Sequence, residues 1–388
     1  MIINNMLLYI LLIISIILLL VYFVYKVKYP FWSRQPVFHH HNLWYWYKPP
    51  GIIQKEKPEM NKYYVPSIRF KEISSLKNEE KMQFYELIKD NFMPFKKELY
   101  DPSLNDIMDY FQGHNDKSFI SLNYKDNFKS IKNNSLISVM TTRPLYVKIN
   151  DSSFSLYYVD YLCVHKKERK RGIAPITIYS HYLNQRYKHD NIIFLFKREG
   201  DTTAIVPLMI YKLFAFDTLI WDKTAEFDEP YIYTLELNEL SSKLFVSLLA
   251  DAQEKFKCVI TPFLGNIIHL TNNKQYIIYL LIYKKEAVGF YVFVDNHTTY
   301  NGRKSLELCA SYCKIKKEIF VLGFFNCINK INKVIPFDII LIEDTSDNNF
   351  ILNILMNRYR TIFESTMSYY FYNYASIPYL SYEVLCIV

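Results

Sequence analysis

The sequence YYVDYLCVHKKERKRGIAP occupies residues 157–175 and changes character twice. Residues 157–164 are apolar and rich in β-forming side chains, which predicts a strand. Residues 165–171 are strongly basic, and Gly172 leads into a helical pattern. A helix N-terminus presents unpaired N–H groups and the positive end of its dipole, and glycine lets an anion approach the backbone closely. The order of strand, basic turn, glycine and helix therefore predicts an anion or phosphate site.

Two other interpretations of the basic run are open. It is compatible with a solvated surface turn, and it also fits a nuclear-localisation or nucleic-acid-binding patch. The run is not repeated elsewhere as a stripe, and it lies between two apolar elements rather than in a tail. We therefore expect no nucleic-acid partner, whereas the solvated turn remains an alternative.

The same residues resemble the signature of the N-myristoyltransferase family, within the acyl-CoA N-acyltransferase superfamily. That signature, LCVHKK, a basic turn and Ala-Pro, is matched here by Leu162, Cys163, Val164, His165, Lys166, Lys167, Arg169, Ala174 and Pro175. The R-x-x-G-x-A spacing from Arg169 also resembles the acyl-CoA pyrophosphate loop of N-acetyltransferases. The resemblance implies that acyl-CoA is bound by Cys163, Val164, Arg169, Lys170, Arg171, Gly172, Ile173, Ala174 and Pro175.

An aromatic segment near the N-terminus carries a second resemblance. Residues 28–37 read KYPFWSRQPV, an extended, proline-limited segment that must pack somewhere. It is similar to the family's FW-x-x-QPV motif, through Phe31, Trp32, Gln35, Pro36 and Val37. The resemblance implies that acyl-CoA is also contacted by Tyr29, Pro30, Phe31 and Trp32.

Residues 6–25 contain no charged side chain and are long enough to span a bilayer. The segment has no preceding Lys or Arg and no small-residue cleavage site, so we expect an uncleaved membrane anchor rather than a signal peptide. A buried core helix is the alternative. Lys26 and Lys28 follow directly, which places the rest of the chain in the cytoplasm by the positive-inside rule. With the opposite orientation, Asn133, Asn150 and Asn296 would be glycosylation targets.

The composition sets further bounds. The chain has 388 residues, a net charge of +8 and six cysteines without a C-x-x-C pair. The positive net charge favours anionic ligands or an anionic membrane face. The cysteine pattern favours reduced, buried cysteines in a cytosolic domain. His39, His40 and His41 are adjacent, and adjacent histidines converge poorly on one ion, so we expect a solvated loop and no metal site.

Alternating helix and strand patterns predict a mixed α/β (α+β) fold. Helices are expected at about 78–92, 102–111, 173–187, 204–216, 238–256, 319–328 and 348–356. Strands are expected at about 117–123, 135–149, 157–164, 191–197, 218–221, 231–235, 275–283, 288–294, 306–312, 337–342, 369–374 and 382–388. The pattern restarts after Trp221, which suggests an anchor (1–27), an N-terminal acyl-CoA-binding half (28–222) and a C-terminal peptide-binding half (223–388). The resemblance implies the same: two pseudo-symmetric acetyltransferase-like halves in one saddle-shaped sheet.

The C-terminal half shows weaker matches to the family. The segments 289–293, 304–312 and 369–378 resemble its D-F-x-S-F-Y, K-x-L-x-A-A-Y and YYLYNW…P stretches. Acylation of a glycine amine needs a proton acceptor and donors for the tetrahedral oxyanion. The resemblance implies that the backbone N–H groups of Tyr161 and Leu162 are those donors, and that the C-terminal carboxylate of Val388 is the base. A plain core strand that ends the chain is the alternative for residues 383–388.

Other segments depart from the family pattern. Residues 206–217 lack its Thr, His and Asn, and Asn91–Tyr100 contains a single acid, Glu98, in place of an acidic loop. Residues 363–365 replace its Gly-Asp-Gly turn, and the last strand is about one residue shorter. The half of the site that would bind acyl-CoA is therefore better matched than the half that would bind peptide.

Three functions follow from these observations. The first is a membrane-anchored glycylpeptide N-tetradecanoyltransferase, with myristoyl-CoA as co-substrate, N-terminal glycine peptides as partners and no permanently bound cofactor. The second is a catalytically degenerate protein that binds acyl-CoA or a lipopeptide on the same fold. The third is a different acyl transfer, to lysine or from another chain length. We expect a monomer.

Overall fold

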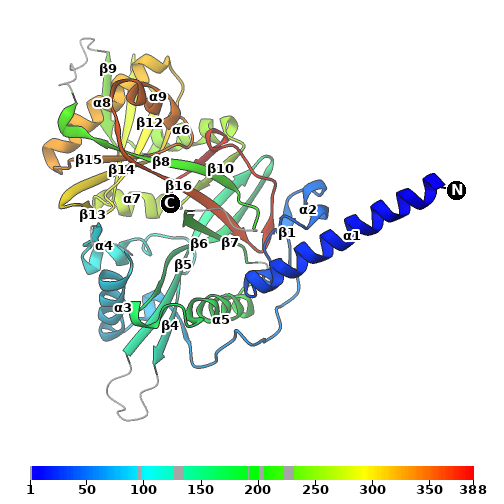
Figure 1. Cartoon of the computed structure of the whole chain (residues 1–388). Coiled ribbons are helices and arrows are strands. Elements are labelled where there is room, and N and C mark those ends of the chain that lie inside the picture. Colours follow the sequence, from blue (N-terminus) through cyan, green and yellow to red (C-terminus); the bar gives the residue numbers. More distant parts are fainter. Residues whose placement is uncertain (1, 94–97, 126–134, 191, 201–204, 222–230) are drawn as a thin grey trace.

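The computed structural model describes residues 2–93, 98–125, 135–190, 192–200, 205–221 and 231–388 (Figure 1). Within them one large sheet runs through the molecule. Its strands lie in the order β18-β10-β5-β6-β7-β16-β8-β15-β14-β12-β11-β9. The predicted mixed α/β fold is confirmed.

The first half of the sheet is an antiparallel meander followed by a crossover. The meander strands pair in sequence order, and the helix α5 then carries the chain to a strand parallel to the last of them. These elements are β4 (Phe119–Lys125), β5 (Ser135–Ile149), β6 (Ser152–Val164), α5 (Ile173–Lys188) and β7 (Phe194–Glu199). Helix α5 begins at Gly172, whose φ of 76° is the left-handed conformation that glycine adopts at no steric cost.

The second half repeats this plan. Three antiparallel strands are followed by the helix α8 and by a strand parallel to the last of the three. The elements are β11 (Tyr276–Tyr283), β12 (Glu286–Val294), β14 (Arg303–Cys313), α8 (Lys317–Val334) and β15 (Ile339–Glu343). Both faces of β11 are buried, in separate hydrophobic clusters, and its sequence YIIYLLIY is accordingly a continuous run of apolar and aromatic residues.

Each half completes its sheet with a strand from the other. The strand β8 (Met209–Asp217) follows β7 in sequence but pairs with β15. The strand β16 (Thr361–Tyr372) follows the helix α9 (Asn348–Arg358) but pairs with β7. The two exchanged strands also pair with each other from Thr361 to Tyr369, and this joins the halves into one sheet.

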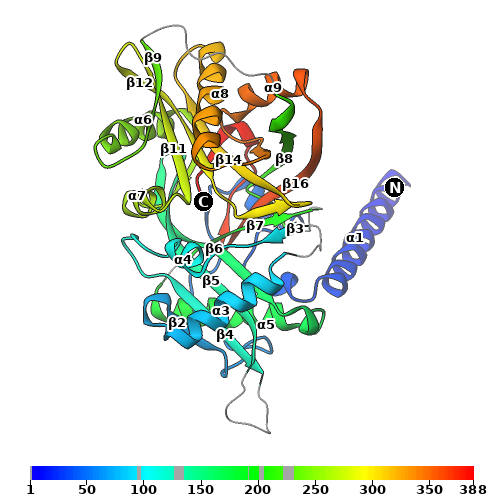
Figure 2. The ribbon, with the colours of Figure 1, turned by 90° about the vertical axis from the view of Figure 1, so that its left-hand side faces the viewer.

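The remaining elements cover or extend this sheet. The helices are α1 (Ile2–Lys28), α2 (Leu43–Tyr47), α3 (Asn78–Asn91), α4 (Leu104–Asp109), α6 (Ser242–Lys255) and α7 (Leu264–Asn272). The short strands are β1 (Gly51–Ile52), β2 (Arg69–Glu72), β3 (Glu98–Tyr100), β9 (Ile232–Glu236), β10 (Cys258–Thr261), β13 (Thr298–Tyr300), β17 (Tyr374–Ala375) and β18 (Val384–Cys386). Helix α1 projects away from the body, while the C-terminus lies at its centre, between the halves (Figures 1 and 2).

Most predicted elements are present, but the helix expected at 204–216 is wrong. Residue 204 lies outside the described part, and residues 209–217 form the central strand β8. The first five residues of β8 alternate between buried and exposed, and the last four are nearly all buried. Phe214 and Phe216 pack against the helices α8 and α9 on one face, and Ala215 packs against other strands of the curved sheet on the opposite face. The strand expected at 218–221 is a 3₁₀ turn, Thr218–Ile220. The strand β10 and the helix α7 were not predicted.

A close backbone contact ties the two halves together beside α7. A Cβ added at Gly265 would lie 2.6 Å from the carbonyl oxygen of Gly113, whereas one added at Gly51 would meet its nearest atom at 4.0 Å. Neither Gly265 nor Gly51 has a positive φ, so an alanine at either position meets no backbone strain and the two substitutions differ only in the space available.

We expect Gly265→Ala to lower the free energy of unfolding by about 1–3 kcal/mol, because the backbone must shift to admit the methyl group. Gly51→Ala should change it by no more than about 0.5 kcal/mol. Denaturant unfolding of both variants in one detergent measures the difference. Equal stability of the two variants would contradict the inter-half contact.

Candidate functional site

The strands β6 and β7 separate soon after they meet. They pair in parallel only at Tyr157–Phe194 and Tyr158–Leu195, while β6 continues to Val164 and β7 to Glu199. Beyond Tyr158, β6 remains paired with β5, and β7 remains paired with β16. A wedge therefore opens in the middle of the sheet, and the backbone of residues 159–164 forms one of its edges.

The direction of the free N–H groups follows from the antiparallel pairing of β6 with β5. The His165 N–H donates to the Ile137 carbonyl oxygen, so hydrogen-bonded pairs with β5 fall at residues 165 and 163. The N–H groups of the alternate residues, 164 and 162, point away from β5. The Leu162 N–H therefore points away from β5, toward the wedge. The Tyr161 N–H is already engaged, at 3.0 Å from the Thr141 Oγ1.

An apolar cavity of about 270 Å³ lies along the wedge. Trp32 stacks on Phe196 at its edge, with ring centroids 5.7 Å apart. The other apolar lining residues are Phe92, Met140, Val159, Leu162, Ile178, Tyr182, Phe194 and Tyr372. Asp160 and Lys197 are the charged lining residues, so the cavity fits an aliphatic chain with a polar group at one end.

A second, polar cavity of about 410 Å³ adjoins the first. Phe92, Val159, Asp160 and Lys197 line both cavities, so the two meet at the wedge. The second cavity is acidic: its charged lining residues besides Lys197 are Glu98, Asp160, Glu199, Glu307 and Glu343, and it also contains the C-terminal residue Val388. An excess of carboxylates suits a cationic ligand such as an ammonium group.

Asp160 has one paired and one free oxygen. Its Oδ1 accepts a hydrogen bond from the Arg143 Nε at 2.8 Å, and the Arg143 guanidinium lies buried between the Tyr110 and Tyr158 rings. Its Oδ2 is buried without a hydrogen-bond partner in the described part of the chain. Burial raises the pKa of Asp160 above its usual value, against the opposing effect of Arg143.

The half-buried Lys197 and the buried Glu343 form the second ion pair of the cavity. Their Nζ and Oε1 atoms lie 2.6 Å apart, Glu307 lies 3.7 Å from the same Nζ, and the Tyr211 hydroxyl donates to Glu343 at 2.8 Å. Burial raises the pKa of Glu343 to about 7, and the neighbouring charge of Glu307 adds to the rise. The cavity therefore holds a carboxyl group whose protonated form is favoured by burial, against the opposing effect of Lys197.

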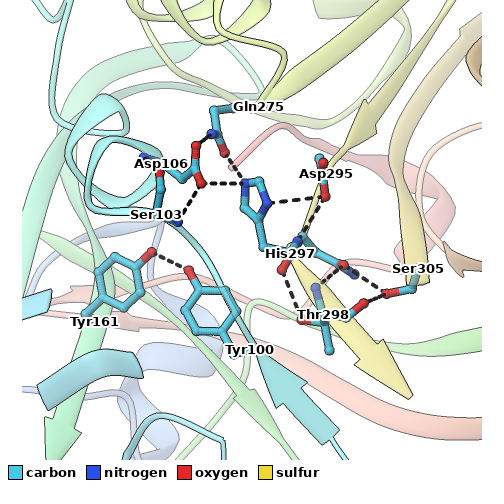
Figure 3. Close-up of polar contacts among 10 residues, drawn as sticks. Tyr100, Ser103, Asp106, Tyr161, Gln275, Asp295, His297, Thr298 and Ser305 are labelled. Carbon is cyan, nitrogen blue, oxygen red and sulfur yellow. Dashed lines mark hydrogen bonds and ion pairs between the residues drawn. The ribbon is translucent and has the colours of Figure 1, made fainter. Parts of the chain in front are cut away.

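A set of polar contacts closes one wall of the acidic cavity (Figure 3). The strand β3 pairs with β13 of the other half, and the Tyr100 and Tyr161 hydroxyls lie 2.8 Å apart. Behind this wall, the His297 Nε2 lies 3.0 Å from the Gln275 Oε1 and 3.8 Å from Asp106. These contacts hold the segment that carries Tyr100 against the C-terminal half.

The structure brings some predicted site residues together in the cavities. Trp32 and Leu162 line the apolar cavity, and Tyr161 and Val388 line the acidic one. Phe31 is buried beside Trp32, and the Tyr63 hydroxyl donates to the Pro30 carbonyl oxygen at 3.2 Å. Tyr29 begins the turn after α1, where its N–H bonds back to Tyr25.

The other predicted residues lie at the far end of β6, outside both cavities. Cys163 is buried, and the Arg169 guanidinium bonds the carbonyl oxygens of Val164, at 3.1 Å, and Asn91. The exposed Arg171 pairs with Glu168 at 2.9 Å. Lys170 and Gly172 adopt positive φ, and the first turn of α5 follows with Ile173, Ala174 and Pro175. This is the turn, glycine and helix order that the sequence indicated.

Five charged cavity residues were not singled out from the sequence. They are Asp160, Lys197, Glu199, Glu307 and Glu343. Asp160 and Glu343 are each the one charged residue of their strand, β6 and β15. That isolation was the available signal, because a lone charge in a buried strand needs a partner or a ligand. In the part of the chain that the structure describes, no three His, Cys, Asp or Glu side chains are grouped to hold a metal ion.

Comparison with known proteins gives two kinds of match. Residues 51–194 match the family model "Myristoyl-CoA:protein N-myristoyltransferase, N-terminal domain". The chain is also similar to the crystal structure of Saccharomyces cerevisiae N-myristoyltransferase with bound myristoyl-CoA, with a TM-score of 0.72 at 12% identity over 92% of this chain and 99% of the yeast chain. A second yeast structure of the same enzyme with myristoyl-CoA gives 0.72 at 13% identity, over 93% and 94%. No curated protein sequence matches.

The sheet of two similar halves is thus the fold that the chain shares with the yeast N-myristoyltransferase structures. The family match itself covers residues 51–194, within the first half of the chain.

The raised pKa of Glu343 predicts how stability depends on pH. A carboxyl group whose pKa is higher in the folded than in the unfolded state favours folding most at low pH, and this contribution is lost as pH rises from about 4.5 to about 7. The free energy of unfolding of the wild type should therefore fall relative to that of Glu343→Gln across this range. Denaturant unfolding of both proteins at a series of pH values measures it. Parallel curves would show that Glu343 keeps an ordinary pKa.

Proposed function

We propose that this chain transfers myristate from myristoyl-CoA to the N-terminal glycine amine of proteins, as a glycylpeptide N-tetradecanoyltransferase-like enzyme. The observation that carries the proposal is the meeting of an apolar cavity and an acidic one at the β6 wedge. A thioester held in the first and an ammonium held in the second would meet beside Val159, Asp160 and Leu162. The yeast structures contain myristoyl-CoA, which supports this ligand for the shared fold.

On the acyl-CoA side, the proposal assigns the acyl chain to the apolar cavity, next to Tyr29–Trp32 and the strand end at Cys163 and Val164. The phosphates would bind Arg169–Pro175. There Lys170, Arg171 and Gly172 are exposed beside the N-terminus of α5, whose dipole and free N–H groups favour an anion.

In the reaction, the acceptor ammonium loses a proton and its nitrogen attacks the thioester carbonyl carbon. The C–N bond forms, the C–S bond breaks, and coenzyme A leaves as a thiolate that takes up a proton. The Leu162 N–H is placed to stabilise the oxyanion, while the Tyr161 N–H would exchange the Thr141 hydroxyl for the substrate oxygen. We assign the base to the Val388 carboxylate, with the free Oδ2 of Asp160 positioning the ammonium.

The proposal includes the placement of the chain. Helix α1 contains a 20-residue stretch, Tyr9–Lys28, that is apolar enough to cross a membrane and is almost entirely exposed. We propose that it anchors a cytoplasmic, monomeric enzyme. Residues 28–222 would then supply the acyl-CoA side and residues 223–388 the peptide side, with β8 and β16 exchanged between them.

One observation favours a second candidate, a protein that binds acyl-CoA or a lipopeptide without turnover. The Tyr161 N–H, one of the two donors expected at the oxyanion, is bonded to Thr141. A site that keeps this bond offers a single backbone donor to the substrate. Each oxyanion donor is worth about 3–4 kcal/mol of transition-state stabilisation, so its loss would slow turnover severely.

The test is made on the full chain in detergent, with myristoyl-CoA and a set of N-terminal glycine peptides. Thiol release and peptide mass should both show acylation. Extending the chain by a few residues beyond Val388 removes the carboxylate from the cavity and should lower kcat by about 10²–10⁴-fold, the usual contribution of a positioned base. Val388→Ala is the control, because it keeps a terminal carboxylate and should retain most activity.

Myristoyl-CoA affinity should be similar in all three proteins, since the carboxylate lies in the acidic cavity. Tight binding without product in the wild type would favour the binding protein. Equal turnover with and without the extension would reject Val388 as the base. Absence of acyl-CoA binding would reject the proposed function.

A further inference from the structure

The segment between α1 and the body of the protein has an unusual surface. Helix α2 reads LWYWY, and Leu43, Trp44 and Tyr47 are 69%, 65% and 87% exposed. Its other side is anchored, because Tyr45 and Trp46 pack against the buried Phe38. Aromatic side chains usually bury their large apolar area in a core, so their exposure on a fixed helix marks an interaction surface.

The position of α2 is set by contacts with the end of α1. The Tyr25 hydroxyl lies 2.8 Å from the His39 Nδ1, and the His41 ring lies 5.4 Å from Tyr22 and 5.1 Å from Tyr25. The loop that leads into α2 is therefore fixed at the level where the uncharged stretch of α1 ends. Figure 1 shows α2 beside α1, on the side of the body from which α1 projects.

The charges of this region point to the partner. Residues 1–55 contain no Asp or Glu, and their cations include Lys26, Lys28, Arg34 and Lys48. The Lys48 ammonium lies 4.8 Å above the Trp44 ring, so a cation adjoins the exposed aromatic side chains. Tryptophan and tyrosine with flanking lysines are the side chains that settle at the boundary between lipid headgroups and acyl chains.

We propose that the exposed face of α2 lies in the headgroup region of the bilayer that α1 spans, with Leu43, Trp44 and Tyr47 inserted among anionic lipids. This inference rests on the membrane anchor of the proposed function and adds a second, peripheral contact. Two membrane contacts, α1 and α2, would fix the orientation of the body on the bilayer. With α1 alone, the turn that follows it would allow the body to pivot. Because Trp32 follows α1 directly, the apolar cavity then lies close to the membrane surface.

The test places a fluorescent NBD probe on single introduced cysteines in the full chain, reconstituted into vesicles of phosphatidylcholine and phosphatidylserine. The six native cysteines are buried, so a surface cysteine is the preferred site of labelling. Tyr47→Cys reports on α2, Leu18→Cys on the middle of α1, and Leu240→Cys, on an exposed site in the other half, is the water control. Nitroxide lipids labelled at the headgroup or deep in the acyl chain quench each probe according to its depth.

We expect the probe at residue 47 to be quenched several-fold more by headgroup nitroxides than the probe at 240, and more by headgroup than by deep nitroxides. The probe at residue 18 should show the opposite depth preference. If the probe at residue 18 is quenched but the probe at residue 47 behaves like the one at residue 240, the contact of α2 with the bilayer is overturned, whereas the membrane anchor is retained. No quenching at either 18 or 47 would overturn both.

Discussion

The separation of β6 from β7 after two residue pairs is the constraint on which the site depends. A parallel pair that continued to Val164 would hydrogen-bond the backbone and seal the middle of the sheet. Since pairing stops at Tyr158, the Leu162 N–H is left pointing into the wedge, and both cavities can reach the same short stretch of β6. The flanking strands β5 and β16 remain paired, so the opening costs few hydrogen bonds and does not loosen the rest of the fold.

Buried carboxylates with incomplete hydrogen bonding surround this opening. Two ion pairs, Arg143–Asp160 and Lys197–Glu343, place buried carboxylates in the cavity lining, and each carboxylate keeps one oxygen without a hydrogen-bond partner in the described residues. Unsatisfied buried oxygens are costly unless a ligand completes them, so they are better explained by binding than by stability. Apolar residues surround one cavity and acidic residues the other, so in the proposed reaction the two substrates would be separated by chemistry until they meet at the wedge.

The sequence predicted local features well and long-range placement poorly. The basic turn and Gly172 were recognisable because a strand end, a left-handed glycine and a helix start are local events. The helix expected at 204–216 is wrong because the end of β8 is an apolar run at the centre of the sheet, buried by helices on one face and by other strands on the opposite face, so the two-residue period is lost there. Lys197 and Glu343 are 146 residues apart, and nothing local announces that they pair. The roles of Tyr161, Leu162 and Val388 remain predictions, because they depend on substrates.

The exchange of β8 and β16 has a consequence for biosynthesis. The partner that completes β7 is β16, which the ribosome makes only after almost the whole remaining chain. The first half therefore waits with an open sheet edge, a state prone to pairing with other chains.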